Sequence, residues 1–336
     1  MSDWSRTVLH LGGRAVDALP PRLRSSVRSA LMRPEPRTVT PDELDTVLAR
    51  ATALMGPAPD EARALLDGIT LALPSAPPED PFSGAYRDWT WELYRTISGR
   101  AAYDTAHEAS PFDLATARQR PFPYQTGSLA LVGRDLVARG HLLECLAGAE
   151  ALARGGAAPA PAPGKPLRVV EFGPGWGNLT GDLVATGLDV TAVELDEKFC
   201  QLIAHRCTGP GQVNVAQGDM LGFVPDEPFD AAVFFESFHH CADHMAMLHR
   251  LHDMLRPGGV VLFASEPIQK LDYAWGPRLD GLSVWSSRTH GWLELGFDNA
   301  YFDRALARSG WSGRRHRLGA GPGETDVIVA WRTPGG

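Results

Sequence analysis

Cysteine is scarce in this 336-residue sequence. Cys145, Cys200, Cys207 and Cys241 form neither a CxxC pair nor the dense spacing of a disulfide framework. We also expect no leader with an apolar segment and a small-residue cleavage site. We therefore expect reduced thiols and a cytoplasmic protein.

Long apolar runs and an overall positive charge are also missing. No stretch approaches the roughly 18 uninterrupted apolar residues of a membrane-spanning helix, so we expect no membrane span. A formal net charge of −8 gives no general attraction for phosphates, which favours a small-molecule substrate over nucleic acid. Residues 1–37 are an exception to the negative net charge, because they contain seven arginines. They are interpreted either as a helix with a solvated basic face or as an arm that binds a membrane surface or a partner.

The chain divides by composition into three parts. Residues 154–166 are rich in Pro, Ala and Gly, which favours an extended linker. Before them, in residues 1–153, helical patterns alternate with proline clusters that should end helices. We predict a mostly helical accessory or lid region here. After the linker, residues 167–336 alternate short apolar runs with amphipathic stretches, the pattern of a doubly wound, Rossmann-like α/β domain.

The expected sheet of this domain has seven strands and is mostly parallel. A connection too short for a crossover helix joins the last two strands, so they should form an antiparallel hairpin. The predicted strands cover residues 167–172, 189–194, 212–217, 230–235, 259–265, 312–318 and 326–331.

A glycine-rich turn follows the first predicted strand. Gly173, Gly175 and Gly177 lack Cβ atoms, so the main chain can turn tightly and approach a ligand, and the helix that follows offers free N–H groups. This is general physics of a nucleotide site, and it fits NAD as well. The GxGxxG spacing fails, however, because Asn178 stands where a third glycine would be.

With Glu171, the three glycines match the E/D-x-G-x-G-x-G loop of the class I S-adenosylmethionine-dependent methyltransferases, which residues 125–336 resemble. The resemblance implies S-adenosylmethionine as cofactor and makes Glu171 and the glycines binding residues. An acid at the end of the second strand can accept hydrogen bonds from both ribose hydroxyls, and Glu194 stands at this position. The resemblance implies that Asp219, after the third strand, binds the adenine amino group and that Met220 packs on the adenine ring. The alternative for Asp219 is that it caps a turn.

The exit of the fourth strand carries Glu236, His239 and His240, and Leu255-Arg-Pro-Gly-Gly259 then resembles the family's entry into its fifth strand. Methyl transfer needs an aligned nucleophile, exclusion of water and a proton acceptor. Either histidine is a candidate general base, with hydrogen bonding to the turn as the alternative. Glu236 is a candidate for contacting the cofactor or for positioning the substrate. His240 and His244 would share a helical face, but a convincing fourth ligand is missing, so we predict no metal.

Two other segments should cover the pocket. In similar enzymes a segment like residues 121–128 closes over the methionine end of the cofactor, which makes Tyr124 and Ser128 candidates; a turn with an N-cap at Ser128 is the alternative. Residues 273–297 are dense in aromatic and polar side chains, which suits a polyhydroxylated ligand, although some of them could instead seal the N-terminal helices onto the core. The candidates are Trp275, Arg278, Asp280, Trp285, Arg288, His290 and Trp292.

This last segment resembles methyltransferases associated with glycan, glycoside and natural-product assembly. The sequence therefore predicts an O- or N-methyltransferase acting on a small polar, sugar-containing or polyhydroxylated acceptor, with a homodimer as a possible assembly. A NAD-dependent oxidoreductase and a non-catalytic methyltransferase-like binding protein are the alternatives. Nucleic-acid amino methyltransferases should carry an N/D-P-P-Y-like run where this chain has Phe235-Glu-Ser-Phe238.

Overall fold

A computed structural model describes residues 36–55, 59–109, 111–155, 165–318 and 326–333. The chain forms two compact units, one of Met1–Ala72 with Asp280–Leu282 and one of Leu73–Leu279 with Ser283–Gly336. This division near residue 72 differs from the boundary predicted at residues 154–166. Most of that predicted linker, and all of the arginine-rich segment before residue 36, lie outside the described residues.

In the smaller unit, two short parallel strands are joined by two helices. β1 (Arg37–Val39) pairs with β2 (Ile69–Leu71), and α3 (Pro41–Met55) and α4 (Pro59–Asp67) connect them. At the start of α3 the Glu43 carboxylate accepts a hydrogen bond from the Thr40 N–H at 2.9 Å, which is one of the two hydrogen bonds of a capping box. Leu44, Leu48 and Leu66 are buried and supply the core of this unit.

The larger unit is built on a seven-stranded sheet in the order β11-β12-β7-β6-β3-β4-β5. The strands from β3 to β7 are parallel, and β12 is antiparallel to both β7 and β11. The predicted doubly wound α/β fold and its C-terminal hairpin are confirmed. The strands are β3 (Arg168–Phe172), β4 (Asp189–Glu194), β5 (Gln212–Gln217), β6 (Phe229–Phe235), β7 (Leu255–Ala264), β11 (Trp311–His316) and β12 (Val327–Arg332).

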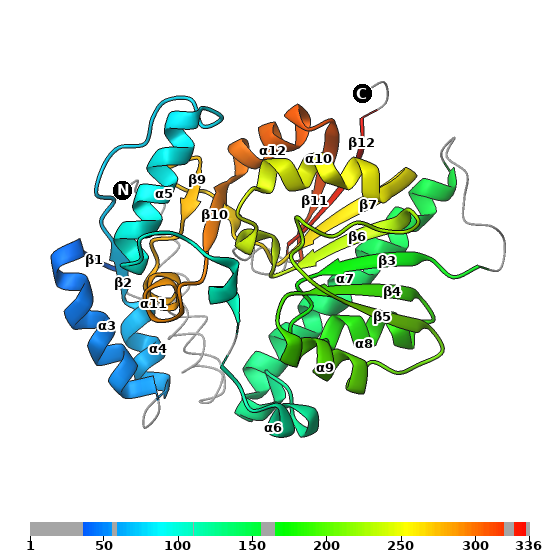
Figure 1. The fold of residues 1–336 in the computed structure, drawn as a ribbon, viewed down its shortest axis with the longest axis horizontal. Coiled ribbons are helices and arrows are strands. Elements are labelled where there is room, and N and C mark those ends of the chain that lie inside the picture. Colours follow the sequence, from blue (N-terminus) through cyan, green and yellow to red (C-terminus); the bar gives the residue numbers. More distant parts are fainter. Residues whose placement is uncertain (1–35, 56–58, 110, 156–164, 319–325, 334–336) are drawn as a thin grey trace, which may run out of the picture. The chain divides into compact units, whose positions relative to one another are not determined.

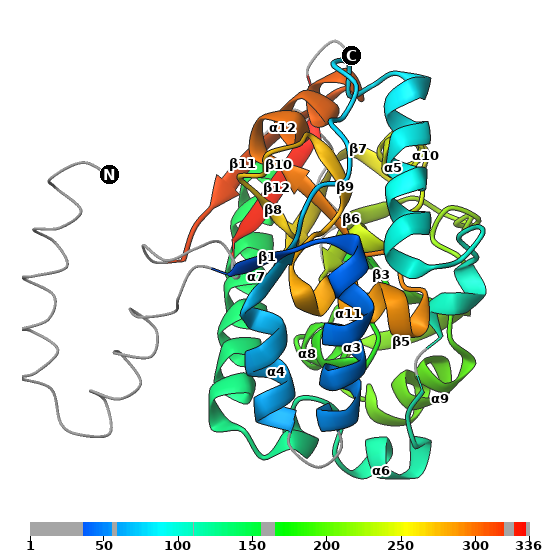
Figure 2. The same ribbon diagram turned by 90° about the vertical axis from the view of Figure 1, so that its left-hand side faces the viewer.

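Helices cover both faces of this sheet. On one face α7 (Leu129–Gly155) and α8 (Asn178–Ala185) pack on Val169, Val233 and Leu262, and α9 (Glu197–Arg206) lies beside α8. On the other face α10 (His244–Met254) and α12 (Asn299–Arg308) pack on Phe234 and Phe263. Figure 1 shows the two groups of helices on opposite sides, and Figure 2 shows α7 as a long helix along the sheet. Strand residues alternate between the two faces.

A three-stranded sheet and a long helix complete the larger unit. β10 (Leu295–Asp298) lies between β8 (Ile268–Gln269) and β9 (Trp275–Pro277). α5 (Gly84–Ser98) packs on β9, where the Tyr86 hydroxyl accepts hydrogen bonds from the N–H groups of Ala274 and Trp275. The remaining elements are η1 (Thr105–Glu108), α6 (Leu114–Gln119), η2 (Tyr124–Thr126), η3 (Phe238–His240) and α11 (Gly281–His290).

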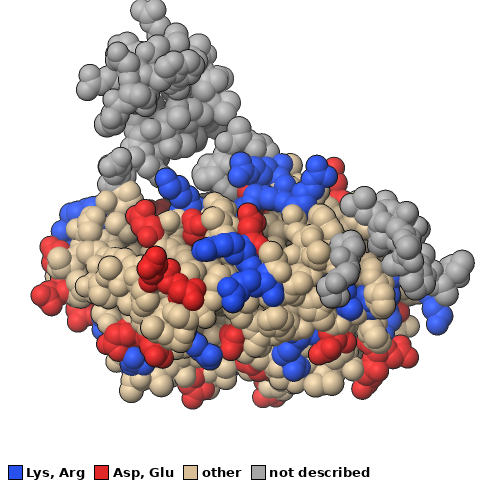
Figure 3. Space-filling model, turned by 90° about the horizontal axis from the view of Figure 1, so that it is seen from above, with Lys and Arg blue, Asp and Glu red and all other residues tan. Residues whose placement is uncertain are grey.

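The described surface is mixed in charge. On the face seen in Figure 3, Lys and Arg side chains are interspersed with Asp and Glu side chains and do not form one continuous basic field. Within the described residues, every helix is too short or too polar to cross a membrane.

Candidate active site

A crevice opens at the carboxyl ends of the parallel strands. β3 lies between β6 and β4, so the strand order reverses beside β3, and ligands of open α/β sheets bind at such a switch point. The crevice has a volume of about 380 Å³, within the range of small-molecule sites. Its wall includes residues at or just beyond the carboxyl ends of β3, β4, β5 and β6, namely Gly173, Gly175, Trp176, Glu194, Leu195, Gly218, Asp219, Met220, Leu221, Glu236, Ser237 and His240.

Two glycines are required for the turn after β3. Gly173 has φ +64°, and a Cβ there would lie 2.8 Å from Cβ of Ser237, so the turns after β3 and β6 can touch only if this residue is glycine. Gly175 has φ +49°, and a Cβ there would meet no atom within 4 Å. Gly175 is one of the residues that line the crevice, so its bare main chain is open to a ligand.

Glu194 joins the end of β4 to this glycine loop. Its carboxylate accepts hydrogen bonds from the N–H of Gly175 at 3.0 Å and from the N–H of Asp196 at 2.9 Å, one on each oxygen. Burial raises the pKa of Glu194, while these backbone donors act in the opposite direction. A carboxylate has about four lone-pair positions, so each oxygen can accept a further hydrogen bond from a ligand in the crevice.

Asp219 and Met220 follow β5 and line the same crevice. One Asp219 oxygen accepts a hydrogen bond from the Leu221 N–H at 2.6 Å. The turn-capping role and the ligand-facing role predicted for Asp219 are therefore compatible, because a carboxylate has a second oxygen.

Glu171 lies behind the glycine loop rather than in the crevice. It is almost fully buried and accepts a hydrogen bond from the Thr180 hydroxyl of α8 at 2.7 Å. Burial raises its pKa to about 7. The prediction that Glu171 binds the cofactor is not retained, because its carboxyl group lies in the core and hydrogen-bonds β3 to α8.

A buried glutamate that sequence reasoning missed holds the turn after β6. Glu266 accepts hydrogen bonds from the backbone N–H groups of Ser237 and Phe238, both at 2.8 Å, and of His239, at 3.2 Å. It also lies 2.8 Å from Nδ1 of His239. Burial alone would raise the pKa of Glu266, but His239 and these backbone donors together lower it. His239 therefore has the hydrogen-bonding role that the sequence offered as the alternative to catalysis.

Glu236 and His240 face the crevice from this turn. Glu236 has φ +52°, an unfavourable conformation for a non-glycine residue, and its N–H donates to the Ala264 carbonyl at 3.0 Å. Nδ1 of His240 lies 3.1 Å from Oε2 of Glu108 in η1. Burial lowers the pKa of His240, but the carboxylates of Glu108, Glu294 and Glu266 outweigh it and raise the pKa to about 9.

The wall around His240 also contains Tyr103, Glu108 and Trp292. The second oxygen of Glu108 accepts a hydrogen bond from the Leu293 N–H at 2.8 Å, and Tyr103 hydrogen-bonds the Glu108 side chain. Burial, with the nearby Glu108 carboxylate, raises the pKa of Tyr103, so its hydroxyl stays protonated. No local motif marks Tyr103 and Glu108, which explains why the sequence did not reveal them.

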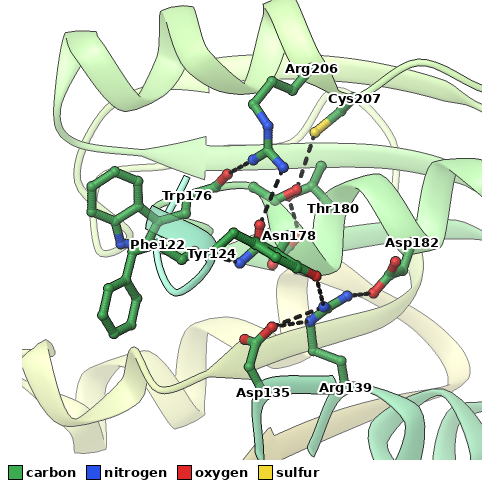
Figure 4. A network of polar contacts seen from close by, with 12 residues as sticks. Phe122, Tyr124, Asp135, Arg139, Trp176, Asn178, Thr180, Asp182, Arg206 and Cys207 are labelled. Atoms are coloured by element: carbon green, nitrogen blue, oxygen red, sulfur yellow. Dashed lines mark hydrogen bonds and ion pairs between the residues drawn. The ribbon is translucent and has the colours of Figure 1, made fainter. Parts of the chain in front are cut away.

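The 121–128 segment is fastened to α8 and α7, as Figure 4 shows. Arg139 donates to the Tyr124 hydroxyl at 3.1 Å and also pairs with Asp135 and Asp182. The Asn178 side chain donates to the Phe122 carbonyl at 2.9 Å. This network fixes the segment across the glycine loop.

Different residues of this region reach the crevice from those predicted. Phe122 and Asp135 line it, whereas Tyr124 and Ser128 are not among the described lining residues. Ser128 accepts a hydrogen bond from the Leu131 N–H at 3.3 Å, as the N-cap alternative anticipated. Neither residue is therefore assigned to the cofactor.

Of the seven substrate candidates in residues 273–297, Trp292 alone is among the described lining residues. Trp275 is buried and its indole N–H donates to the Pro81 carbonyl at 2.9 Å. Arg288 donates to the Thr96 carbonyl of α5 at 3.3 Å. The segment forms β9, α11 and β10. Arg278 follows β9, and Asp280 forms an isolated β-bridge with Thr70. Trp285 packs edge-on against His290, which stacks on Trp292.

The histidines beyond His240 point elsewhere. His244 is buried, and its Nε2 lies 2.6 Å from the Tyr301 hydroxyl; burial lowers its pKa to about 4, so it is neutral. Over the ranges that the structure describes, no three His, Cys, Asp or Glu side chains are grouped as metal ligands.

Comparison with known proteins finds similarity to methyltransferases over part of this domain. Residues 170–263 match the family model of a methyltransferase domain. An uncharacterized methyltransferase of Anoxybacillus flavithermus is 35% identical over 99 residues, which are 29% of this chain and 45% of that protein. Ribosomal RNA small subunit methyltransferase A of a Synechococcus strain is 39% identical over 90 residues, 26% of this chain and 32% of that protein. The matches thus span less than half of these relatives.

The solved structures that are similar to this chain include a methyltransferase that acts on an amino pentose. The amino pentose methyltransferase CalS10 of Micromonospora echinaspora, solved with S-adenosylmethionine, has a TM-score of 0.41 and 20% identity to this chain. The alignment covers 68% of this chain and all of that one.

Proposed function

We propose that this chain, which carries a methyltransferase domain over residues 170–263, transfers the methyl group of S-adenosylmethionine to a small polar acceptor. One observation carries the proposal. At the switch point of the sheet, the bare main chain of Gly175 and the carboxylate of Glu194 meet on the wall of one crevice. Such a pair suits an adenosyl ligand, because the glycine admits it and the acid accepts from its ribose.

The residues of the crevice fit S-adenosylmethionine. Glu194 would hold the ribose hydroxyls, and Asp219 with Met220 would hold the adenine. When bound, this cofactor supplies a sulfonium methyl group that is open to direct attack by a nucleophile. Phe122 and Trp176 line the crevice beside the glycine loop, and their ring centroids lie 6.1 Å apart. These two rings would help to keep water away from the cofactor.

A small acceptor fits better than nucleic acid. One relative is named as an RNA methyltransferase, but this chain has a net charge of −8. The described residues that line the crevice include neither Lys nor Arg, although phosphate backbones require such side chains. Tyr103, Glu108 and Trp292 offer aromatic faces and hydrogen-bonding groups, which supports a sugar-containing or polyhydroxylated acceptor.

A NAD-dependent oxidoreductase is the alternative from another enzyme class, because Glu194 would also suit a NAD ribose. The antiparallel β11–β12 pair and the family match argue against it. Heat denaturation of the full chain with saturating S-adenosylmethionine, S-adenosylhomocysteine or NAD separates the two. We expect both adenosyl compounds to raise the melting temperature. Protection by NAD alone would contradict the proposal.

A methyltransferase-like protein without turnover is the second alternative. Radioactive methyl transfer from S-adenosylmethionine to a panel of sugars and amino sugars tests it. We expect label in at least one acceptor. Tight binding of S-adenosylhomocysteine without any transfer would favour the non-catalytic alternative.

A further inference from the structure

We propose that the acceptor wall, defined as Tyr103, Glu108, His240 and Trp292, binds a cationic amine, and that its nitrogen is the atom that is methylated. This inference rests on the proposed methyl transfer and narrows the acceptor to one chemical class. It is carried by the charge of the crevice, by the pairing of the groups in the wall and by the protonation state of the only histidine among the described lining residues.

The crevice is strongly negative. Five carboxylates line it, whereas His240 is the one cationic side chain among the described lining residues, which include neither Lys nor Arg; the acids are Glu108, Asp135, Glu194, Asp219 and Glu236. Asp135 is paired with Arg139, which is not among the described lining residues. S-adenosylmethionine has one net positive charge, so bound cofactor would leave the site negative. A phosphorylated, nucleotide-linked or carboxylated acceptor would be repelled, and an ammonium group would be attracted.

The acceptor wall has the groups that a cation requires. Glu108 is mostly buried, and its oxygens face His240 at 3.1 Å and the Leu293 N–H at 2.8 Å. Tyr103 and Trp292 add aromatic faces, which attract cations. A carboxylate that shares one wall with two aromatic side chains is a suitable site for an alkylammonium group.

His240 is a poor proton acceptor in this wall. The groups that face it are Glu108 from η1, Glu294 before β10, Glu266 after β7 and its neighbour His239. The three carboxylates raise its pKa to about 9, so at neutral pH it is an imidazolium. A sugar hydroxyl would need a base to become a good nucleophile. An amine needs none during the transfer itself, because its neutral form already has a lone pair.

The transfer balances without another reactant. The bound ammonium first loses one proton to water. The nitrogen lone pair then forms a bond to the methyl carbon while the carbon–sulfur bond breaks, and the electron pair of that bond stays on sulfur. The positive charge passes from sulfur to the methylated nitrogen, where the carboxylates of the crevice stabilise it.

Matched acceptors test the proposal with the full chain. The probes are glucosamine against glucose and galactosamine against galactose, each at millimolar concentration with labelled S-adenosylmethionine, and mass spectrometry locates the methyl group. We expect transfer to the nitrogen of an amino sugar at a rate at least tenfold above that of its hydroxy counterpart. Transfer to oxygen at equal or higher rates, or transfer to neither set while S-adenosylhomocysteine binds, would overturn the inference. Failure to bind S-adenosylhomocysteine would instead overturn the proposed function.

A conservative variant tests the role of Glu108 separately. Glu108→Gln keeps the size of the side chain and its acceptor for Leu293 but removes the charge. We expect KM for the amino acceptor to rise at least tenfold while Kd for S-adenosylhomocysteine changes less than twofold. Glu92→Gln, on the exposed surface of α5 beside Arg95, is the control and should change neither value. An unchanged KM in a folded Glu108→Gln protein would contradict the assignment.

Discussion

The carboxylate of Glu194 accepts a hydrogen bond from the N–H of Gly175 at 3.0 Å. The acid at the end of β4 therefore holds the glycine loop in place as well as facing the crevice. Replacing Glu194 by Ala removes both the loop contact and the acceptor for the ribose. We expect Kd for S-adenosylhomocysteine, measured by calorimetry, to rise at least tenfold, the loss of about 1.4 kcal/mol or more expected for charge-assisted hydrogen bonds. Unchanged binding would remove Glu194 from the site.

Glu266 should be the most sensitive of the buried acids to substitution. It accepts three backbone hydrogen bonds and pairs with His239, and Gln cannot satisfy all four donors. We expect Glu266→Gln to lower the free energy of unfolding by roughly 2–4 kcal/mol at pH 7, measured by urea denaturation. Glu92→Gln should change it by less than about 0.5 kcal/mol. Equal effects of the two variants would show that the turn does not depend on Glu266.

The raised pKa of His240 predicts that the folded protein loses stability at alkaline pH. Its pKa is raised from 6.5 to about 9 in the folded protein. A raised pKa means that the ion pair with Glu108 stabilises the fold fully below pH 6.5 and that this contribution disappears as the pH rises to about 9. We expect the wild-type melting temperature to fall over this window. His240→Gln should fall less, and parallel curves would refute the pairing.

Glu171 should affect the stability of the fold at lower pH than His240 does. Burial raises its pKa from 4.5 to about 7, so the folded protein loses stability as the pH rises from 4.5 to 7, by up to about 3 kcal/mol. Glu171→Gln resembles the protonated acid and keeps an acceptor for Thr180. The stability of this variant relative to the wild type should therefore increase between pH 4.5 and 7 in chemical denaturation. A pH-independent difference would place an ionised carboxylate in the core.

Much of the fold could be predicted, because apolar runs and glycine turns are local signals. β4 and β5 have the predicted bounds. β7 begins at Leu255 rather than at residue 259, since Leu255 pairs with Phe229 across a bulge, a contact between strands that one strand's sequence does not encode.

The site was predictable mainly at the carboxyl ends of the strands. Glu194 ends β4, and Asp219 and His240 follow β5 and β6, so they were found in the crevice. Glu108 was missed because packing between distant segments brings it to His240. Glu266 follows β7, but no local motif marks it as the partner of His239. Trp275 and Arg288 were misjudged for the same reason: a chain rich in aromatic and polar residues suits a pocket and a packed interface equally well.

A crystal structure of the full chain with S-adenosylhomocysteine would show whether the crevice is the cofactor site. We expect the ligand in the crevice beside Gly175, with its ribose hydroxyls on the Glu194 carboxylate and its adenine against Met220. Ligand bound elsewhere, or a crevice that stays closed at saturating concentration, would contradict this expectation.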